Sequence, residues 1–323
     1  MLLGIEIGGT KLQLGIGRGD GSPLVALDRL DVEPAAGAAG IRRQLETAVP
    51  RLIARHAIRA IGIGFGGPVD TDSGRTLKSH QIEGWDDFPL ARWCRETFGV
   101  PTAISNDSDS AGLAEARFGA GQGSRVVFYT NAGSGVGGAL VLDGRVYRGG
   151  SGVAAELGHL RPGLEAVRPD QTVEAAASGW GIVATARAKL AAASRSDPAA
   201  ADLLQRCRGD SALLTGGLIA AAAAEGNPLA REAFQHAVAT FGWAIAQMIT
   251  LLSPQTVVVG GGVSLAGETI FLGPLREAVE RYVFPPSRGT YKIVLAQLGE
   301  AVVVHGALAI ALEASCVGQA PRT

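Results

Sequence analysis

The chain has 323 residues, of which 47% are hydrophobic and 18% are charged, and its formal net charge is −1. This length accommodates two domains or one large α/β unit, and the composition is typical of a folded protein rather than a disordered one. No run of Lys or Arg exceeds two residues, which argues against a nucleic-acid partner.

The cysteines and the apolar segments of the chain indicate where in the cell the protein is found. Cys94, Cys207 and Cys316 are far apart and odd in number, which predicts reduced thiols in a cytoplasmic protein and no Cys-x-x-Cys zinc site. The first β-like run begins at residue 2, so we expect no signal peptide. No apolar run approaches the length of a membrane span, so we expect no membrane partner.

The first part of the chain alternates strand-like and helix-like segments. We expect strands at residues 2–7, 11–17 and 24–32, a helix at 41–56 with apolar residues at helical spacing, and an apolar strand at 60–65. A helix at 90–98, a strand at 101–105 and a helix at 108–118 follow. The glycine-rich segment Gly119-Ala120-Gly121-Gln122-Gly123 is the expected hinge.

After this segment the pattern starts again. We expect a hairpin at 126–130 and 139–142, helices at 179–193, 213–224 and 228–252, a strand at 257–259, a helix at 272–281, a strand at 293–295 and a final helix at 302–313. The order β-β-β-α-β-α-β-α therefore occurs twice. It predicts an α/β fold of two domains facing a cleft, a small one from 1–118 with 304–323 and a large one from 119–303. We expect a ligand that touches both domains to close them about the hinge.

Three glycine-rich turns follow strand-like runs. They are Gly8-Gly9-Thr10-Lys11, Gly133-Ser134-Gly135-Val136-Gly137-Gly138 and Gly260-Gly261-Gly262. Glycine lets backbone N–H groups approach an anion that a β-carbon would keep at a distance. The first two turns lie between strands, which indicates two hairpins that hold the phosphates of a nucleotide, with the third loop placed for its adenosine.

Two better-known phosphate motifs do not explain these turns. Gly4 and Gly9 have the spacing of a P-loop, but Thr10-Lys11 reverses the last pair and a strand follows. Residues 62–67 and 133–138 match Gly-x-Gly-x-x-Gly, but neither opens a helix, as the dinucleotide fingerprint requires. A Rossmann dehydrogenase is therefore disfavoured.

Charged side chains beside the first turn have two interpretations. Gly-Gly is a common hairpin turn, so Thr10 and Lys11 need no ligand. The similar second hairpin favours a phosphate site instead. Glu6 is an acid inside the first strand, where unpaired carboxylates are rare, and beside a triphosphate it would hold waters of a Mg²⁺ ion.

Asn106-Asp107 ends one predicted strand and precedes a helix. Both residue types are favoured helix N-caps, and local sequence alone favours that role. The carboxyl ends of strands in open α/β sheets are also where ligands bind. An Asp there would accept the proton of a substrate hydroxyl as it attacks phosphorus.

Two further acidic segments have alternative interpretations. Glu156-Leu157-Gly158-His159 is either a solvated loop or part of a site, and Glu174 is either an acid favourably placed at a helix N-terminus or a ligand-binding group. Carboxylates and an imidazole that converge on one site would suit a polyol, because vicinal hydroxyls are recognised by paired hydrogen bonds.

Taken together, these motifs resemble the ROK family (repressors, open reading frames and sugar kinases) of the actin-like, ribonuclease H-like ATPase superfamily. The resemblance covers essentially the whole chain and includes Gly66-Gly67-Pro68-Val69-Asp70 as the sugar-side loop. It implies ATP as phosphoryl donor, Mg²⁺, a homodimer and Asp107 as general base. It also implies that Gly67, Asn106, Asp107, Glu156, His159 and Glu174 bind the sugar, and that Gly8, Gly9, Thr10, Lys11, Gly133, Ser134, Gly135, Gly260, Gly261 and Gly262 bind the nucleotide.

The chain departs from the family pattern at two places. Many members carry a Cys-rich zinc segment after the Glu-x-Gly-His motif, whereas residues 160–173 contain no cysteine, so we expect no zinc and a loop held by packing. The missing segment bears on sugar preference, because it sets the positions of His159 and Glu174. The other departure is Glu6, where many relatives have Asp.

The sequence thus predicts an ATP-dependent hexose kinase, with glucose phosphorylated on its 6-hydroxyl as the first choice. N-acetylmannosamine, N-acetylglucosamine, fructose and allose are alternative substrates, and polyphosphate is an alternative donor. A sugar-sensing repressor is disfavoured because the first hairpin begins at residue 2, before any helix-turn-helix module. A non-catalytic sugar-binding protein is opposed by Asp107 and both hairpins.

Overall fold

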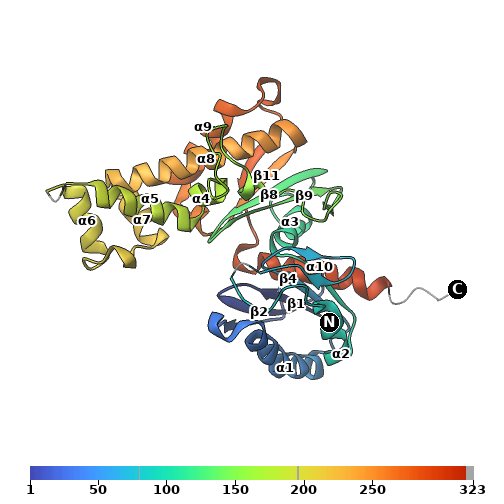
Figure 1. Ribbon diagram of the computed structural model, residues 1–323. Helices are drawn as coiled ribbons and strands as arrows, with labels where there is room; N and C mark the ends of the chain where they lie inside the picture. The colour runs from blue at the N-terminus through green and yellow to red at the C-terminus, as the bar shows by residue number, and fades with distance from the viewer. Residues whose placement is uncertain (80, 195, 318–323) are drawn as a thin grey trace. The chain divides into compact units, whose positions relative to one another are not determined.

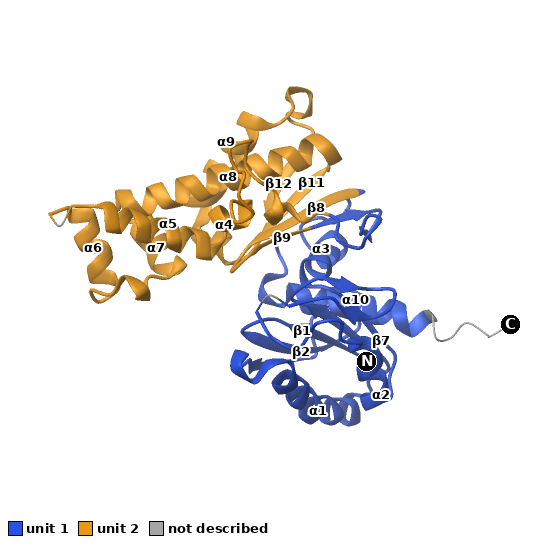
Figure 2. Cartoon of the chain, in the orientation of Figure 1, with its two compact units in different colours: residues 1–125, 139–154, 296–323 blue, residues 126–138, 155–295 orange. Residues whose placement is uncertain are grey.

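The computed structural model describes residues 1–79, 81–194 and 196–317 (Figure 1). The chain divides into two compact units, coloured separately in Figure 2. Unit 1 contains Met1–Arg125, Ala139–Ala154 and the segment that starts at Ala296, and unit 2 contains Val126–Gly138 and Ala155–Leu295. Residues 318–323, which belong to the predicted small domain, lie outside the described residues.

The two five-stranded sheets have the same strand order. The first runs β3-β2-β1-β4-β7 and the second β10-β9-β8-β11-β12, so that each reads 3-2-1-4-5 when its strands are numbered along the chain. In the first sheet β1, β2 and β3 are antiparallel, and in the second β9 and β10 are antiparallel. In each sheet the last two strands run parallel to the first. The strands are β1 (Leu2–Ile7), β2 (Lys11–Gly17), β3 (Ala26–Asp31), β4 (Ile61–Phe65), β7 (Thr102–Asn106), β8 (Val126–Ala132), β9 (Val136–Leu142), β10 (Arg145–Tyr147), β11 (Thr256–Gly260) and β12 (Lys292–Leu295). This repeated order confirms the predicted α/β fold class.

Helices flank the sheets. They are α1 (Gly37–His56), α2 (Leu90–Phe98), α3 (Asp107–Phe118), α4 (Val173–Ala177), α5 (Gly179–Ala192), α6 (Pro198–Arg206), α7 (Gly216–Ala224), α8 (Pro228–Leu252), α9 (Gly273–Tyr282) and α10 (Val302–Val317). Short helical turns are η1 (Pro34–Ala36), η2 (Leu157–His159), η3 (Ser211–Leu213), η4 (Gly262–Ala266), η5 (Glu268–Leu272), η6 (Pro285–Ser287) and η7 (Gly299–Ala301), and β5 (Val69–Asp70) pairs with β6 (Arg75–Thr76).

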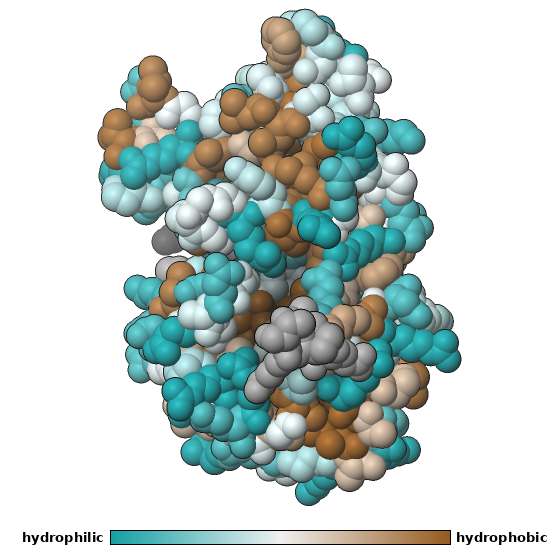
Figure 3. Space-filling view, turned by 90° about the vertical axis from the view of Figure 1, so that its right-hand side faces the viewer, coloured by the Kyte–Doolittle hydropathy of each residue, from teal (hydrophilic) through white to brown (hydrophobic). Residues whose placement is uncertain are grey.

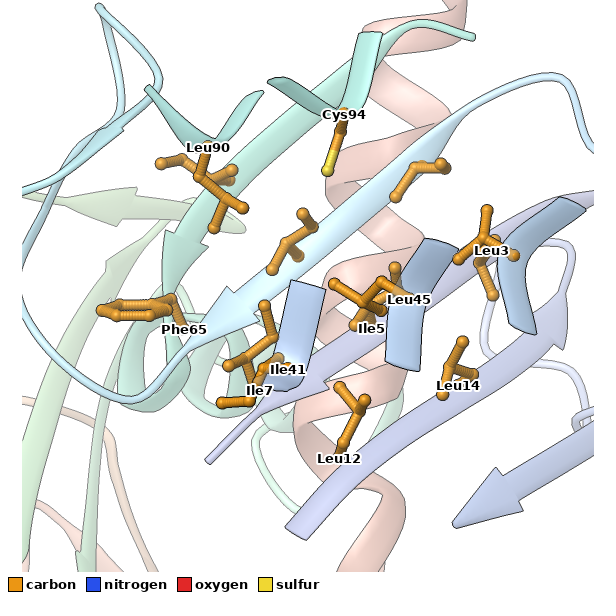
Figure 4. Close-up of a cluster of buried hydrophobic side chains, with 14 of the residues drawn as sticks. Leu3, Ile5, Ile7, Leu12, Leu14, Ile41, Leu45, Phe65, Leu90 and Cys94 are labelled. Carbon is orange, nitrogen blue, oxygen red and sulfur yellow. The ribbon is translucent and has the colours of Figure 1, made fainter. Parts of the chain in front are cut away.

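Successive side chains of a strand point to opposite faces of its sheet. In the first sheet, large apolar side chains lie on one face and glycines lie on the other. Leu3, Ile5 and Ile7 of β1 face the core that α1 completes, as Figure 4 shows. The alternating positions include Gly4 and, on β4, Gly62, where an added Cβ would overlap the backbone of α10. Glycine at these positions lets α10 pack directly on the sheet, which places the last long helix in unit 1.

One sequence expectation needs correction at this helix. Within the described residues, Gly299–Cys316 is long and apolar enough to be a candidate membrane span, which the expectation of no such run overlooked. Half of that window is buried inside the structure, and α10 packs against β1, β4 and α3. Core packing therefore accounts for its composition.

Two large apolar clusters lie among the described residues of unit 2. One joins β8 and β11 to α8 and α9 through residues such as Phe128, Val257, Phe241 and Leu275. The other lies among α5, α6, α7 and α8. On the face drawn in Figure 3, hydrophobic side chains form separate groups among hydrophilic ones. Helix α6 had no counterpart in the sequence expectations, whereas α4 forms the helix start expected at Glu174 and α8 begins and ends at the predicted residues.

Candidate active site

Unit 1 brings together the carboxyl ends of three neighbouring strands. The Gly66 N–H donates to the Ile7 carbonyl oxygen at 2.8 Å, and the Asn106 side-chain N–H donates to the Gly67 carbonyl oxygen at 3.0 Å. The Asp107 carboxylate lies beside Gly66. These are the ends of β1, β4 and β7, where ligands bind in sheets of this kind.

Asn106 is the N-cap of α3. Its side-chain oxygen accepts from the N–H groups of Ser108 at 2.8 Å and Asp109 at 3.2 Å. Because its amide nitrogen also donates to Gly67, both ends of the side chain fix the turn that carries Asp107. The helix cap expected for this pair therefore falls on Asn106, and Asp107 is the first helical residue.

Asp107 has the electrostatic character expected of a base. Its carboxylate accepts from the Ser108 N–H at 2.7 Å. The residue is partly exposed, but its carboxyl group is surrounded by protein, and this burial raises its pKa above the ordinary 3.8 although the hydrogen bond to Ser108 lowers it. A carboxylate with a raised pKa is a better proton acceptor than an exposed one.

Glu6 and Lys11 flank the first glycine turn as an ion pair. Lys11 Nζ lies 3.1 Å from Glu6 Oε1, and the Glu6 side chain is buried whereas Lys11 keeps 44% of its side chain exposed. Burial raises the pKa of Glu6, Lys11 lowers it, and the negative charge of Asp107 raises it again. Glu6, Lys11 and Asp107 thus form one coupled group of charges in unit 1.

The second glycine turn lies in unit 2 and is shorter than expected. β9 begins at Val136, so only Gly133-Ser134-Gly135 is turn and Gly137-Gly138 belongs to a strand. The Gly133 N–H donates to the Gly135 carbonyl oxygen at 2.8 Å, and the Gly179 N–H donates to the Gly133 carbonyl oxygen at 2.8 Å. The start of α5 therefore holds one side of this turn.

The predicted sugar-binding groups of unit 2 lie on adjoining elements. Glu156 precedes η2, His159 ends it, and the Val173 N–H at the start of α4 donates to the Leu160 carbonyl oxygen at 2.8 Å. Glu174 Oε2 accepts from the Val136 N–H at 2.8 Å. Glu174 thus touches the strand that follows the second turn, a contact that the sequence did not predict.

The third glycine loop borders a cavity of ≈ 730 Å³ in unit 2. Gly260 ends β11, Gly261 adopts φ 87°, and Gly262 opens η4. The lining of the cavity is Gly133, Ser134, Gly179, Trp180, Ile182, Val183, Arg187, Leu214, Thr215, Gly216, Gly217, Ala220, Phe234, Gly262, Val263, Leu265 and Ala266. The Gly133–Gly135 turn, predicted to bind phosphate, and the Gly260–Gly262 loop, predicted to bind adenosine, therefore both border one mainly apolar cavity whose volume suits a nucleoside.

Sequence reasoning missed several lining residues of this cavity. Trp180 is 73% exposed on α5. Thr215 caps α7 by accepting from the Leu218 N–H at 3.2 Å, and the sequence signal for this helix start was Thr215-Gly216-Gly217. Arg187 donates to the carbonyl oxygens of Ser211 at 2.8 Å and Ala212 at 2.7 Å, so it fixes the segment that leads into α7.

A cavity of ≈ 890 Å³ in unit 1 lies between β3 and α1 and contains none of the predicted site residues. Its lining includes Arg43, Arg51 and Arg55 of α1 but no glycine turn and no strand end. The larger volume of this cavity therefore does not make it the site that the sequence predicts, which is at the strand ends. Among residues 1–79, 81–194 and 196–317, no three His, Cys, Asp or Glu side chains cluster as a metal site.

Comparisons with known proteins show which proteins this chain is similar to. A sequence model of the ROK family matches residues 2–314. A glucokinase of Streptomyces coelicolor is 30% identical over 318 residues, 97% of this chain and 98% of that protein. The bifunctional enzyme NanE/NanK of Brucella melitensis is 32% identical over 239 residues, 73% of this chain and 40% of that protein. The crystal structure of a ROK family glucokinase from Streptomyces griseus, in complex with glucose and AMPPNP, is 31% identical, covers 97% of this chain and 99% of that one, and has a TM-score of 0.82.

Proposed function

The chain belongs to the ROK family and has its actin-like α/β fold, and on that premise we propose that it is an ATP-dependent kinase that phosphorylates the 6-hydroxyl of glucose. Similarity to glucokinases over the whole length supports this substrate class. The complex of the Streptomyces griseus relative with glucose and AMPPNP supports the pairing of a sugar with an adenine nucleotide.

The observation that carries the proposal is the position of Asp107. It lies where β7 ends, beside Gly66, with Asn106 holding the adjacent Gly67. As the 6-oxygen forms its bond to the γ-phosphorus, the bond from that phosphorus to the β–γ bridging oxygen breaks and ADP leaves. The proton of the hydroxyl passes to Asp107, whose raised pKa suits that task.

The remaining sugar contacts follow from the family resemblance. Gly67, Asn106, Glu156, His159 and Glu174 would bind the sugar hydroxyls. The Gly8–Lys11 turn, the Gly133–Gly135 turn and the Gly260–Gly262 loop would hold the nucleotide, and the ≈ 730 Å³ cavity of unit 2 would receive the nucleoside.

Magnesium fits the carboxylates of unit 1. Glu6 and Asp107 are close enough for the charge of one to raise the pKa of the other, and a divalent cation nearby would favour both ionised forms. In the described residues no protein cage of three or more ligands exists, so the nucleotide phosphates would supply most of the coordination, with Glu6 acting through a bound water. The bound ion would neutralise the charge of the transferred group.

The sequence leaves two alternatives open. N-acetylmannosamine is the second candidate sugar, and N-acetylglucosamine, fructose and allose complete the panel. Polyphosphate is the second candidate donor. The homodimer, the cytoplasmic location, the absence of zinc and the two domains with a hinge at 119–123 stay predictions.

A coupled assay of ADP release tests the proposal against a panel of hexoses and N-acetylhexosamines. We expect the highest kcat/KM with glucose and ATP, and loss of the signal when Mg²⁺ is chelated. A parallel assay of sugar phosphate with polyphosphate separates the donors. Absence of phosphorylation for every sugar with either donor would refute the kinase, and a preference for N-acetylmannosamine would change the substrate but keep the reaction.

A further inference from the structure

A single residue, Val136, joins the second phosphate turn to the predicted sugar-binding segments of unit 2. It is the first residue of β9 and directly follows Gly133-Ser134-Gly135. Its N–H donates to Glu174 Oε2 at 2.8 Å. Its carbonyl oxygen lies against Gly158, where an added Cβ would overlap it. Both polar groups of this residue are thus contacted from α4 and η2.

Glu174 also lies close to Gly135, the last residue of the turn. A Cβ on Gly135 would lie 2.5 Å from Glu174 Oε2, so only glycine lets the carboxylate approach the turn this closely. On the other side of the turn, the Gly179 N–H donates to the Gly133 carbonyl oxygen. A carboxylate that accepts a backbone N–H forms a charge-assisted bond, which is stronger and more directional than a neutral one.

The elements that make these contacts are fixed to one another. The Thr172 hydroxyl caps α4 by accepting from the Ala175 N–H at 3.2 Å, and Ser178 caps α5 by accepting from the Gly181 N–H at 3.1 Å. The Val173 N–H holds α4 to the residue after η2. Glu174 and Gly158 thus lie on adjoining ordered segments, and both segments contact Val136.

We propose that Glu174 is a positioning residue that couples the sugar site to the second phosphate turn through Val136. The inference rests on the proposed function, because it assigns the other carboxylate oxygen, Oε1, to a sugar hydroxyl. When sugar binds Oε1, the carboxylate is held in one orientation and Oε2 fixes the Val136 N–H. The turn is then ordered before the nucleotide arrives, so that glucose raises the affinity for the nucleotide and, by linkage, the nucleotide raises the affinity for glucose.

The first measurement concerns the bond alone and needs no ligand. Hydrogen exchange of the Val136 amide should be faster in Glu174→Ala, which removes the acceptor, than in wild type. Glu174→Gln keeps an acceptor oxygen at the same reach and should restore the protection. Thr172→Ala is the matched control, because it weakens the start of α4 without touching Val136.

The second measurement concerns the coupling. The affinity for AMPPNP is measured by calorimetry with and without saturating glucose, with folding of every variant checked by circular dichroism. We expect glucose to increase the affinity of wild type and of Thr172→Ala by at least about fivefold, the lower end of common coupling factors. In Glu174→Ala at a glucose concentration raised to saturate the variant, the factor should fall to about one.

The possible results distinguish failure of the coupling from failure of the proposed function. If both ligands bind and Glu174→Ala keeps the wild-type coupling factor, the bond to Val136 only stabilises the turn and this inference is wrong. If Val136 exchange does not change in Glu174→Ala, the contact itself is refuted. If wild type binds neither glucose nor AMPPNP, the proposed function fails and the coupling fails with it.

Discussion

The first two glycine turns each join the first two strands of sheets that share one strand order, yet they are stabilised differently. The Gly8-Gly9-Thr10 turn is flanked by Glu6 and Lys11 of its own strands, which form an ion pair. The Gly133-Ser134-Gly135 turn has an internal bond from the Gly133 N–H to the Gly135 carbonyl oxygen, and it is also held by α5 at Gly133 and by α4 at the adjacent Val136. The first turn therefore has charged side chains of its own hairpin beside it, whereas the second depends on helices that come later in the chain.

The largest expected effect comes from a change in unit 1, in the group of charges formed by Glu6, Lys11 and Asp107. Asp107→Asn should lower kcat by roughly 10²–10⁴-fold, the usual cost of losing a general base, with little change in glucose binding measured by calorimetry. Asp28→Asn, a change of the same type at an exposed residue of β3, should leave kcat unchanged. Near wild-type kcat in Asp107→Asn would show that Asp107 only supports the start of α3.

The same charge group should make stability depend on pH. The pKa of Asp107 in the folded protein lies above its ordinary 3.8, so the folded state holds this proton more tightly than the unfolded chain does. The contribution is complete below 3.8 and is lost as the pH rises through the raised pKa. Asp107→Asn should therefore have a higher Tm than wild type at neutral pH, and this advantage should shrink on acidification.

The pH dependence of activity is a second way to measure the direction in which the pKa of Asp107 is shifted. Because the base must be ionised to accept the proton, kcat/KM of wild type should fall on acidification with a midpoint above 3.8. Melting curves and rate profiles from about pH 4 to about pH 8 cover both effects. An equal Tm difference at every pH would contradict the assigned direction.

The next effect compares the turns directly. Lys11→Met removes the cation of the first turn and leaves Glu6 buried without its partner, so kcat/KM for ATP should fall by roughly 10–100-fold, as expected for loss of a charged hydrogen bond. Ser134→Ala keeps every backbone N–H of the second turn and should cost less than about threefold. Equal losses in the two variants would show that the turns use their side chains alike.

The sequence predicted elements whose signals are local. The strands of both sheets follow two-residue periodicity or short apolar runs, and α8 has Asn227 as its cap and Pro228 as its first residue. Helix α6 offered the same kind of start in Asp197-Pro198, and its buried Ala199, Ala200 and Leu203 lie at helical spacing. It is only nine residues long, so its pattern is short. The short α4 is defined by caps at both ends more than by periodicity.

The site shows the same division between local and long-range signals. The sequence left Asn106-Asp107 as either cap or catalytic pair, and the structure gives the cap to Asn106 while Asp107 lies beside Gly66. The bond between Val136 and Glu174 joins residues 38 positions apart. No local pattern encodes such a contact, because it depends on how α4 packs beside β9.

The smallest expected effect concerns the nucleoside side of the second turn. Trp180 lines the ≈ 730 Å³ cavity next to Gly133 and Ser134 and is 73% exposed. If the base of ATP stacks on its indole ring, Trp180→Ala should raise KM for ATP by roughly 2–10-fold, since aromatic stacking contributes about 0.5–1.5 kcal/mol. We expect kcat to stay close to wild type, because the ring touches the nucleoside and not the transferred group. Leu251→Ala, which removes a side chain that is 74% exposed and outside the cavity lining, is the control. An unchanged KM for ATP, together with unchanged tryptophan fluorescence when wild type is titrated with AMPPNP, would place the base away from Trp180 and leave the second turn as the only contact of this region with the nucleotide.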